Sequence, residues 1–217
     1  MRACLNILAF VFLFSPVTGQ EKEKRFELGP TLITINSLSS TYHSFVDKPS
    51  IEYSNGLFFK YNKKRFAFRS TISYNESYFK YYAPAGCFDC TSGESINKDF
   101  RIGVGVQYSL LKNKDVWYTF TDLSYRNIYS VGYVYGGLAG LNNSFSSSTD
   151  GMDGLIGFGL KLKLFEDIFI FPEVGYNIFY GKVNYSTAHL LYGEARRYKY
   201  IEGDLNPVAK LHLTVRF

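Results

Sequence analysis

Three histidines are the side chains of this 217-residue chain best suited to acid–base chemistry. Acyl hydrolysis by a serine or threonine needs a histidine beside the nucleophile and a third group that orients the imidazole. His189 comes closest to this pattern, because Ser186, Thr187 and Glu194 lie near it in the sequence. Since serine and threonine are abundant in all the long polar segments, this spacing is weak evidence, and we predict no catalytic residue.

Cys87 and Cys90, in the sequence Cys-Phe-Asp-Cys, offer redox or metal chemistry. A zinc site needs about four ligands, and no cluster of histidine or cysteine lies nearby in the sequence. A redox dithiol of the thioredoxin type requires a βαβ context, which the sequence lacks. In an exported chain we therefore expect a disulfide that closes a small loop, with no metal and no cofactor.

A mostly basic cluster with interleaved tyrosines follows His189. Such residues can contact anionic sugars or lipid head groups through charge-assisted hydrogen bonds and cation–π interactions. A solvated loop has the same composition, so both interpretations stay open. The candidate contact residues are Tyr192, Arg196, Arg197, Tyr198 and Lys199. The net charge of +5 is too small to imply a nucleic acid partner.

The first 19 residues have the organisation of a secretory signal peptide. The positive charge of Arg2 precedes an apolar run over residues 5–14, and Gly19 ends a stretch of small residues suited to cleavage. The apolar run is too short for a membrane-spanning helix. Removal of residues 1–19 leaves 23 Lys and Arg against 19 Asp and Glu. A charged leader over residues 20–25 then precedes the predicted domain, residues 26–217.

From residue 26 onward, apolar and polar residues alternate in blocks of about ten. A period of two predicts strands with two unlike faces, and the aromatic content of 18% favours strands over helices. In the last block, alternate residues from Ala209 to Phe217 are apolar, whereas Lys210, His212 and Arg216 lie on the other face. The predicted strands cover residues 26–36, 51–61, 65–77, 98–110, 116–128, 153–165, 168–181 and 205–217.

The connections between these blocks alternate in length. Residues 62–64, 112–115 and 166–167 form short polar turns. The long connections are residues 37–50, 78–97, 129–152 and 182–204. Short turns at one end and long loops at the other are typical of an outer-membrane barrel. We therefore predict an all-β fold, an eight-stranded antiparallel up-and-down transmembrane β-barrel with short periplasmic turns and long extracellular loops. Ten strands remain an alternative if residues 129–152 contain a further hairpin.

The direction in which the apolar faces point separates a membrane barrel from a soluble one. A soluble barrel buries its apolar face in a core, whereas an outer-membrane barrel presents that face to lipid. The polar faces here carry many small residues, which suit a crowded narrow interior. Aromatic residues near the strand ends suit two interfacial girdles. These residues are Phe26, Tyr61, Phe66, Trp117, Phe165 and Phe217 near the short turns, and Tyr53, Tyr74 and Tyr180 nearer the loops.

The segment Leu211-His212-Leu213-Thr214-Val215-Arg216-Phe217 resembles the C-terminal signature of bacterial outer-membrane barrels. Together with the signal peptide, the eight blocks and the loop layout, it makes residues 26–217 similar to the small OmpA/OmpX-type barrels of Gram-negative bacteria. The resemblance implies an outer-membrane location and recognition of Leu213, Val215 and Phe217 by the barrel-assembly machinery. It also implies a monomer that contacts outer-membrane lipid and lipopolysaccharide. No periplasmic peptidoglycan-binding domain follows, so we expect no anchoring to the cell wall.

With the apolar faces outward, a polar network is predicted to line the lumen. Its charged residues and single histidine are Glu52, Lys60, Arg69, Arg101, Asp122, Arg126, Lys161, Lys163, Glu173, Lys210, His212 and Arg216. Cations outnumber acids in this set, eight to three. The set describes either an ion-paired plug or a small gated pore that prefers anions. An eight-stranded interior has room for little more than side chains, which argues against free diffusion of solutes.

The expected role is structural or interaction-based: membrane integrity, adhesion or ligand capture through the long loops. Three alternatives stay open. The first is a small gated channel. The second is a barrel enzyme that acts on lipid or peptide at the outer leaflet. The third is a soluble exported barrel of the calycin type that binds an apolar ligand.

Overall fold

The computed structural model describes residues 25–36, 50–83, 86–87, 89–111, 114–137, 141–189 and 195–217. Their regular secondary structure consists of strands. Among these residues, no helix has the length and apolar character needed to cross a membrane. The strands are β1 (Phe26–Asn36), β2 (Ser50–Lys63), β3 (Phe66–Tyr81), β4 (Thr91–Leu111), β5 (Lys114–Gly136), β6 (Leu141–Leu160), β7 (Leu162–Lys163), β8 (Ile168–His189) and β9 (Ala195–Arg216).

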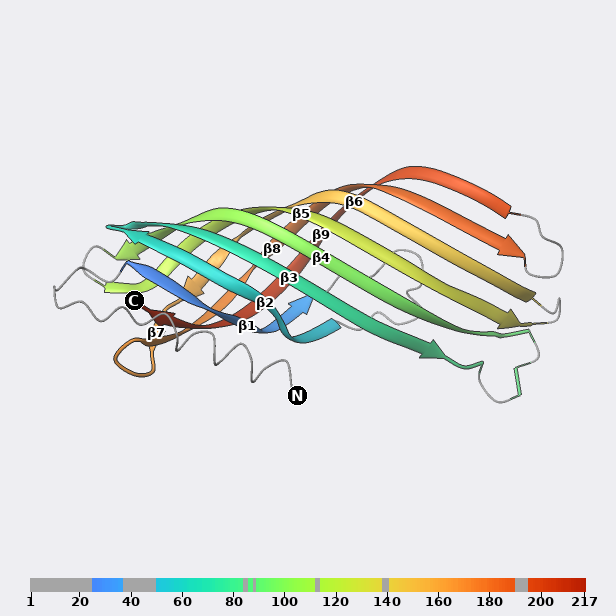
Figure 1. The fold of residues 1–217 in the computed structure, drawn as a ribbon, viewed down its shortest axis with the longest axis horizontal. Coiled ribbons are helices and arrows are strands. Elements are labelled where there is room, and N and C mark those ends of the chain that lie inside the picture. Colours follow the sequence, from blue (N-terminus) through green and yellow to red (C-terminus); the bar gives the residue numbers. More distant parts are fainter. Residues whose placement is uncertain are drawn as a thin grey trace.

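The strands form one closed antiparallel ring (Figure 1). Strands that follow one another in the chain pair with each other from β1 to β6, and β9 closes the ring by pairing with both β1 and β8. β6 pairs with β8, and the two-residue β7 continues β6 beyond Lys161 along the same neighbour. The ring therefore has eight strand positions, as the sequence predicted.

Three segments predicted to be long loops are largely strand. β3 continues to Tyr81, and β5 and β6 together span most of residues 129–152. β8 and β9 likewise extend into residues 182–204. The prediction of loops there is wrong because composition rich in Ser, Gly, Asn and Tyr does not prevent pairing in a long hairpin, where each strand satisfies its neighbour's backbone groups. Residues 129–136 and 141–148 pair with each other as the far end of β5 and β6, so they add no further strand to the ring and a ten-stranded ring does not form.

The strands on one side of the ring are much longer than those on the other side. β1 has 11 residues, whereas β4, β5, β8 and β9 have 21 to 23. β3 pairs with β2 only up to Ser73, and beyond that point its described pairing is with β4 alone. The long strands therefore project beyond β1 and β2 as a wall (Figure 1). This extended wall comprises residues 74–81, 91–100, 127–136, 141–150, 182–189 and 195–201.

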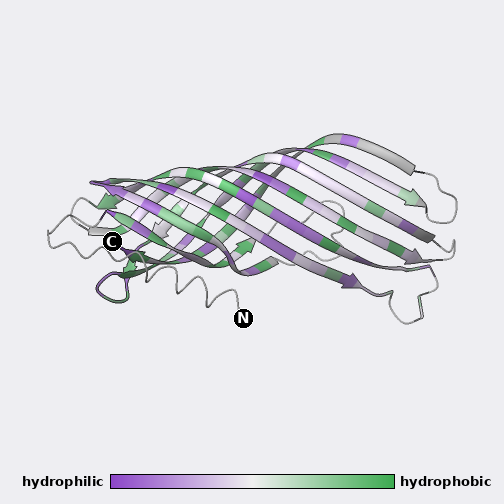
Figure 2. Ribbon diagram, in the orientation of Figure 1, coloured by the Kyte–Doolittle hydropathy of each residue, from purple (hydrophilic) through white to green (hydrophobic). Residues whose placement is uncertain are grey.

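The alternation along each strand directs apolar side chains outward and polar ones inward. On β4, Val104 is 65% exposed, whereas Gln107 and Ser109 are buried. On β9, Leu205 is 61% exposed, whereas His212 is fully buried. The ribbon accordingly changes between hydrophobic and hydrophilic residues along its strands (Figure 2). The faces are thus assigned as the sequence predicted, with ionic groups inside and large apolar groups outside.

Gly159 on β6 makes room for a buried aromatic ring. A Cβ atom at this position would lie 2.3 Å from Cζ of the Tyr118 ring. Tyr118 is 1% exposed and donates a hydrogen bond to Glu173 (2.8 Å), so its ring has little freedom to move aside. A glycine is therefore required where the ring crosses the strand.

We expect Gly159→Ala to lower the free energy of unfolding by about 1–3 kcal/mol, because the added methyl group overpacks the interior against Tyr118. Urea unfolding in detergent micelles, followed by loss of heat-modifiable gel migration, measures this change. Gly154→Ala is the matched control on the same strand, because a Cβ there would meet only the Ile178 carbonyl oxygen at 3.9 Å. Equal unfolding free energies for the two variants would contradict the prediction.

Candidate functional site

The candidate site is the charged interior of the ring. Alternate residues on every strand point inward, so side chains distant in sequence converge there. They form three clusters, each named here for its central carboxylate: the Glu27 cluster, the Glu173 cluster and the Asp99 cluster. Together the clusters determine whether the interior can bind, catalyse or conduct.

The Glu27 cluster lies nearest the short turns. Glu27 is fully buried on β1 and pairs with Lys60 at 2.8 Å, Lys161 at 2.7 Å and Arg216 at 2.8 Å. The Asn62 amide also donates to it, over 3.0 Å. Aromatic rings support the cations, since Lys60 Nζ lies 4.1 Å from the centre of the Phe171 ring. One carboxylate thus partly neutralises three cations.

The Glu173 cluster connects four strands, β3, β5, β8 and β9. Arg69 donates two parallel hydrogen bonds to the Glu173 carboxylate, over 2.7 and 2.8 Å. The Tyr118 hydroxyl donates a third bond (2.8 Å). Arg69 Nε lies 2.9 Å from Oδ1 of Asp122, so the guanidinium lies between two acids. His212 contributes its Nε2, 3.2 Å from Glu173.

His212 also lies in a hydroxyl–imidazole–carboxylate chain. Oγ1 of Thr31 is 3.0 Å from Nδ1 of the ring, and Glu173 is on the opposite side. This order is that of a nucleophile, a base and an orienting acid. The ring stacks on Phe58 at 4.4 Å and is fully buried, and Thr31 is buried too. The chain of contacts is therefore enclosed in the packed interior of the ring.

The Asp99 cluster lies farther along the interior. Asp99 accepts hydrogen bonds from Arg101 (2.6 Å) and from Arg126 (2.7 Å). Arg126 Nε is also 3.9 Å from Asp153, which accepts a 3.0 Å bond from the Asn177 amide. The cluster therefore pairs two guanidinium groups with two carboxylates.

A small cavity of about 20 Å³ lies beside this cluster. Its lining residues are Arg101, Ser124, Asp153, Leu155, Asn177, Val208 and Lys210. Between this cavity and the short turns, the interior is filled by aromatic rings. Phe58 and Phe171 are fully buried, and Tyr118 and Phe120 pack with them.

Most predicted lumenal residues lie in this interior. Lys60, Lys161 and Arg216 meet at Glu27, whereas the other clusters contain Arg69, Arg101, Asp122, Arg126, Glu173 and His212. Lys210 lines the cavity, and Glu52 accepts a 2.5 Å bond from the Asn55 amide. Lys163 belongs to none of the three clusters. It is exposed in β7 at the turn end of the ring, although its strand partner is the inward Phe169.

Three acids of the interior were not among the predicted residues: Glu27, Asp99 and Asp153. Each lies on the polar face of its block by the same alternation, so the signal was present in the sequence. With these acids included and Lys163 excluded, the described interior holds seven Lys and Arg against six Asp and Glu. The strong predicted excess of lumenal cations is therefore wrong.

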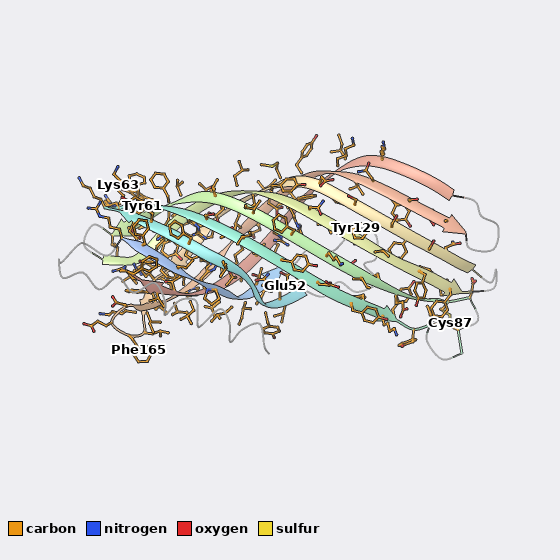
Figure 3. The ribbon with its side chains drawn as sticks, viewed as in Figure 1. Glu52, Tyr61, Lys63, Cys87, Tyr129 and Phe165 are labelled. Carbon is orange, nitrogen blue, oxygen red and sulfur yellow. A yellow bond between two sulfur atoms is a disulfide. The ribbon has the colours of Figure 1, made fainter. Side chains whose placement is uncertain are left out.

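The remaining predicted residues lie near the far ends of the strands. Cys87 and Cys90 form the predicted disulfide, with Cα atoms 5.5 Å apart, at the tip of the β3–β4 hairpin (Figure 3). Arg196, Arg197, Tyr198 and Lys199 belong to β9 and not to a loop, and Lys199 is exposed. Tyr192 lies outside the described residues.

Comparisons with known proteins give a limited picture. No family model and no curated protein matches the sequence. One similar solved structure is the crystal structure of the P. putida toluene transporter TodX, with 12% sequence identity and a TM-score of 0.31. The match covers 89% of this chain and 57% of that chain, so this chain spans a little over half the length of the transporter.

We expect Glu173→Gln to lower the free energy of unfolding by about 3–5 kcal/mol, because it leaves the buried Arg69 guanidinium without its main counter-charge. Urea unfolding in micelles of one detergent at neutral pH measures the loss. Asp150→Asn is the matched control, since Asp150 is an exposed carboxylate that accepts hydrogen bonds from Tyr125 and Asn127. A Glu173→Gln variant as stable as this control would show that the Glu173 cluster does not stabilise the ring.

Proposed function

We propose that this chain is an outer-membrane β-barrel protein of the OmpA/OmpX type that acts through its outer surfaces and not through a pore. The short turns face the periplasm and the extended wall faces the cell exterior. The observation that carries this proposal is the inverted burial, with paired ions inside the ring and large apolar side chains on its outside. The proposed role is membrane integrity, adhesion or ligand capture.

The outward apolar band supports a lipid environment. Exposed Val104, Ile156 and Val174 are typical of its middle. Leaving so many apolar side chains in water would forgo about 25 cal/mol for each Å² of buried apolar surface. A soluble calycin-type barrel would instead direct these residues to a central ligand cavity. The charged interior argues against that alternative.

Aromatic residues flank the band at both ends. Phe26, Tyr61, Phe66, Trp117, Phe165 and Phe217 lie near the short turns, and Tyr53, Tyr74 and Tyr180 lie toward the extended wall. All of these except Tyr61 are well exposed. Such rings suit the two membrane interfaces. In Figure 3, Tyr61 and Phe165 lie at the turn end of the ring, and Tyr129 lies much farther along it.

Phe217 extends the pairing between β9 and β1, the strands that close the ring. The backbone groups of Phe217 and Phe26 exchange two hydrogen bonds, of 2.9 and 3.2 Å, and the two rings stack with centroids 6.1 Å apart. We assign Leu213, Val215 and Phe217 as the signal for the assembly machinery. The protein would then insert as a monomer among outer-membrane lipid and lipopolysaccharide after removal of its signal peptide.

The packed interior argues against the channel alternative. Phe58, Lys60, Phe171 and His212 are all fully buried within the ring. The near balance of acids and bases also removes the excess of fixed charge that would select anions. Function is therefore assigned to the outer surface and to the extended wall.

Labelling of single cysteines tests location and orientation together. We expect Tyr135→Cys, in the extended wall, to react with a large maleimide–polyethylene glycol reagent on intact Gram-negative cells. Glu166→Cys, in the turn before β8, should react only after the outer membrane is opened. The protein should fractionate with outer membranes in a heat-modifiable form. The reverse labelling pattern, or recovery in the soluble periplasmic fraction, would contradict the proposal.

Planar-bilayer recording tests the assignment of a closed interior. We expect the reconstituted protein to give no current steps, because side chains fill the cross-section of the ring. Protein recovered from the bilayer vesicles must retain heat-modifiable migration, so that silence is measured on folded protein. Steady conductance that falls in Lys161→Gln or Arg101→Gln would replace this assignment with the anion-preferring channel.

A further inference from the structure

A second exposed aromatic surface lies on the extended wall, beyond the apolar band. We define it as the tyrosine face, which consists of Tyr78, Tyr82, Ile96, Tyr129, Val131, Tyr133 and Tyr135. Tyr78 is 57% exposed, and all the other members are exposed as well. Contiguous exposed apolar surface of this kind marks an interaction site when no burial requirement explains it.

Strand pairing makes this surface continuous across β3, β4 and β5. Tyr78 lies opposite Ile96, which in turn lies opposite Val131. The next row begins at Lys80 and ends at Tyr133. Because paired residues point to the same side of a sheet, these side chains share one outward surface. The rings of Tyr133 and Tyr135 are 6.1 Å apart.

The face stops abruptly at the neighbouring strand. The partners of Tyr129, Val131 and Tyr133 on β6 are Ser148, Ser146 and Ser144. These serines are in turn paired with Asn184, Ser186 and Ala188 on β8. At the outward positions of these rows, tyrosine on β5 is therefore replaced by serine, asparagine and alanine on β6 and β8.

Polar residues separate the tyrosine face from the apolar band. Glu76 and Lys98 pair across β3 and β4, between the Tyr74–Phe100 row and the Tyr78–Ile96 row. On β5, Tyr129 already lies opposite Lys98, and the boundary there is Asn127, opposite Phe100. Tyr135 is also 18 residues along β5 from Trp117, about 60 Å of extended strand. A tilted strand crosses a membrane in about 9–11 residues. The tyrosine face thus lies outside the hydrocarbon layer in the proposed orientation.

The chemistry of the face matches a sugar. A tyrosine ring offers an apolar face against which C–H groups can pack, and its hydroxyl both donates and accepts hydrogen bonds. Among the rings lies a charged group: Glu94 pairs with Lys80 at 3.0 Å and accepts a hydrogen bond from the Tyr78 hydroxyl. That bond, and then the bond from Lys80, lower the pKa of the Glu94 carboxyl. It therefore stays ionised at neutral pH as a strong acceptor for sugar hydroxyls.

We propose that the tyrosine face binds the core saccharide of lipopolysaccharide molecules that surround the protein, an inference that rests on the proposed outer-membrane location. The face points sideways from the wall and begins one row beyond the apolar band. In a lipopolysaccharide leaflet, the lateral neighbour at this level is the saccharide layer above the acyl chains. A protein partner would have to displace that layer to reach the face.

The test compares sugar binding by two triple variants. Tyr78→Thr/Tyr133→Thr/Tyr135→Thr removes the face and keeps strand-forming residues. Tyr53→Thr/Tyr176→Thr/Tyr180→Thr removes three exposed tyrosines of the apolar band and is the matched control. The probe is delipidated core oligosaccharide released from rough-type lipopolysaccharide, and titration calorimetry on heat-modifiable protein in detergent measures its affinity. We expect at least a ten-fold weaker affinity for the first variant and a change of less than two-fold for the control.

Three results would overturn the inference. The unmodified protein fails to bind the free oligosaccharide, or both triple variants bind it with equal affinity. The third result is that the protein binds intact lipopolysaccharide but binds the lipid A portion alone equally well. A dimer in sedimentation analysis that only the first variant loses, and that the sugar leaves intact, would make the face an interface between copies. Cysteine labelling distinguishes failure of this inference from failure of the proposed function. If labelling places the protein in the outer membrane but the protein binds no core sugar, only this inference is refuted.

Discussion

The bidentate pair between Arg69 and Glu173 is the interaction on which the rest of the ring depends. Arg69 comes from β3 and Glu173 from β8, on opposite parts of the strand order. Arg69 contacts Asp122 and Glu173 contacts Tyr118, and both of these residues lie on β5. Glu173 also contacts His212 on β9, which in turn contacts Thr31 on β1. Bidentate pairing fixes direction as well as distance, so strands that share no backbone hydrogen bonds are held in one arrangement.

Burying these charges is costly, and the surrounding contacts show how the cost is offset. A buried ion pair stabilises a fold only when further hydrogen bonds satisfy the remaining donors and acceptors. Glu173 has such partners in Tyr118 and His212, and the Arg69 guanidinium lies 4.3 Å from the centre of the Phe120 ring. Most of the charged interior groups are paired, although buried atoms such as Gln107 Oε1 and Thr214 Oγ1 have no hydrogen-bond partner. Little chemistry is therefore left for a solute. The surfaces that remain available are those outside the ring.

The sequence was sufficient to predict which residues of each strand face inward, but not how long each strand is. A period of two needs only a few residues to be recognised, so Arg69 and His212 could be assigned to the interior without coordinates. Glu27, Asp99 and Asp153 lie within the predicted strands 26–36, 98–110 and 153–165, and the same rule would have assigned them to the interior. Strand length depends instead on pairing with a partner distant in sequence. Segments such as residues 141–150 have loop-like composition and become strand because β5 and β8 lie on either side.

The extended wall has a small core of its own, which bears on the meaning of its tyrosines. On its inner side Phe145 and Val183 are buried, and the Phe145 ring stacks on Tyr185 with centroids 6.5 Å apart. These inward residues and the ladder of backbone hydrogen bonds stabilise the wall beyond the ends of β1 and β2. The outward tyrosines are therefore not needed for the wall to fold. The neighbouring strand β6 has serine at the positions paired with Tyr129 and Tyr133. A feature that folding does not require, present on one side only, is best explained by contact with a neighbour on that side.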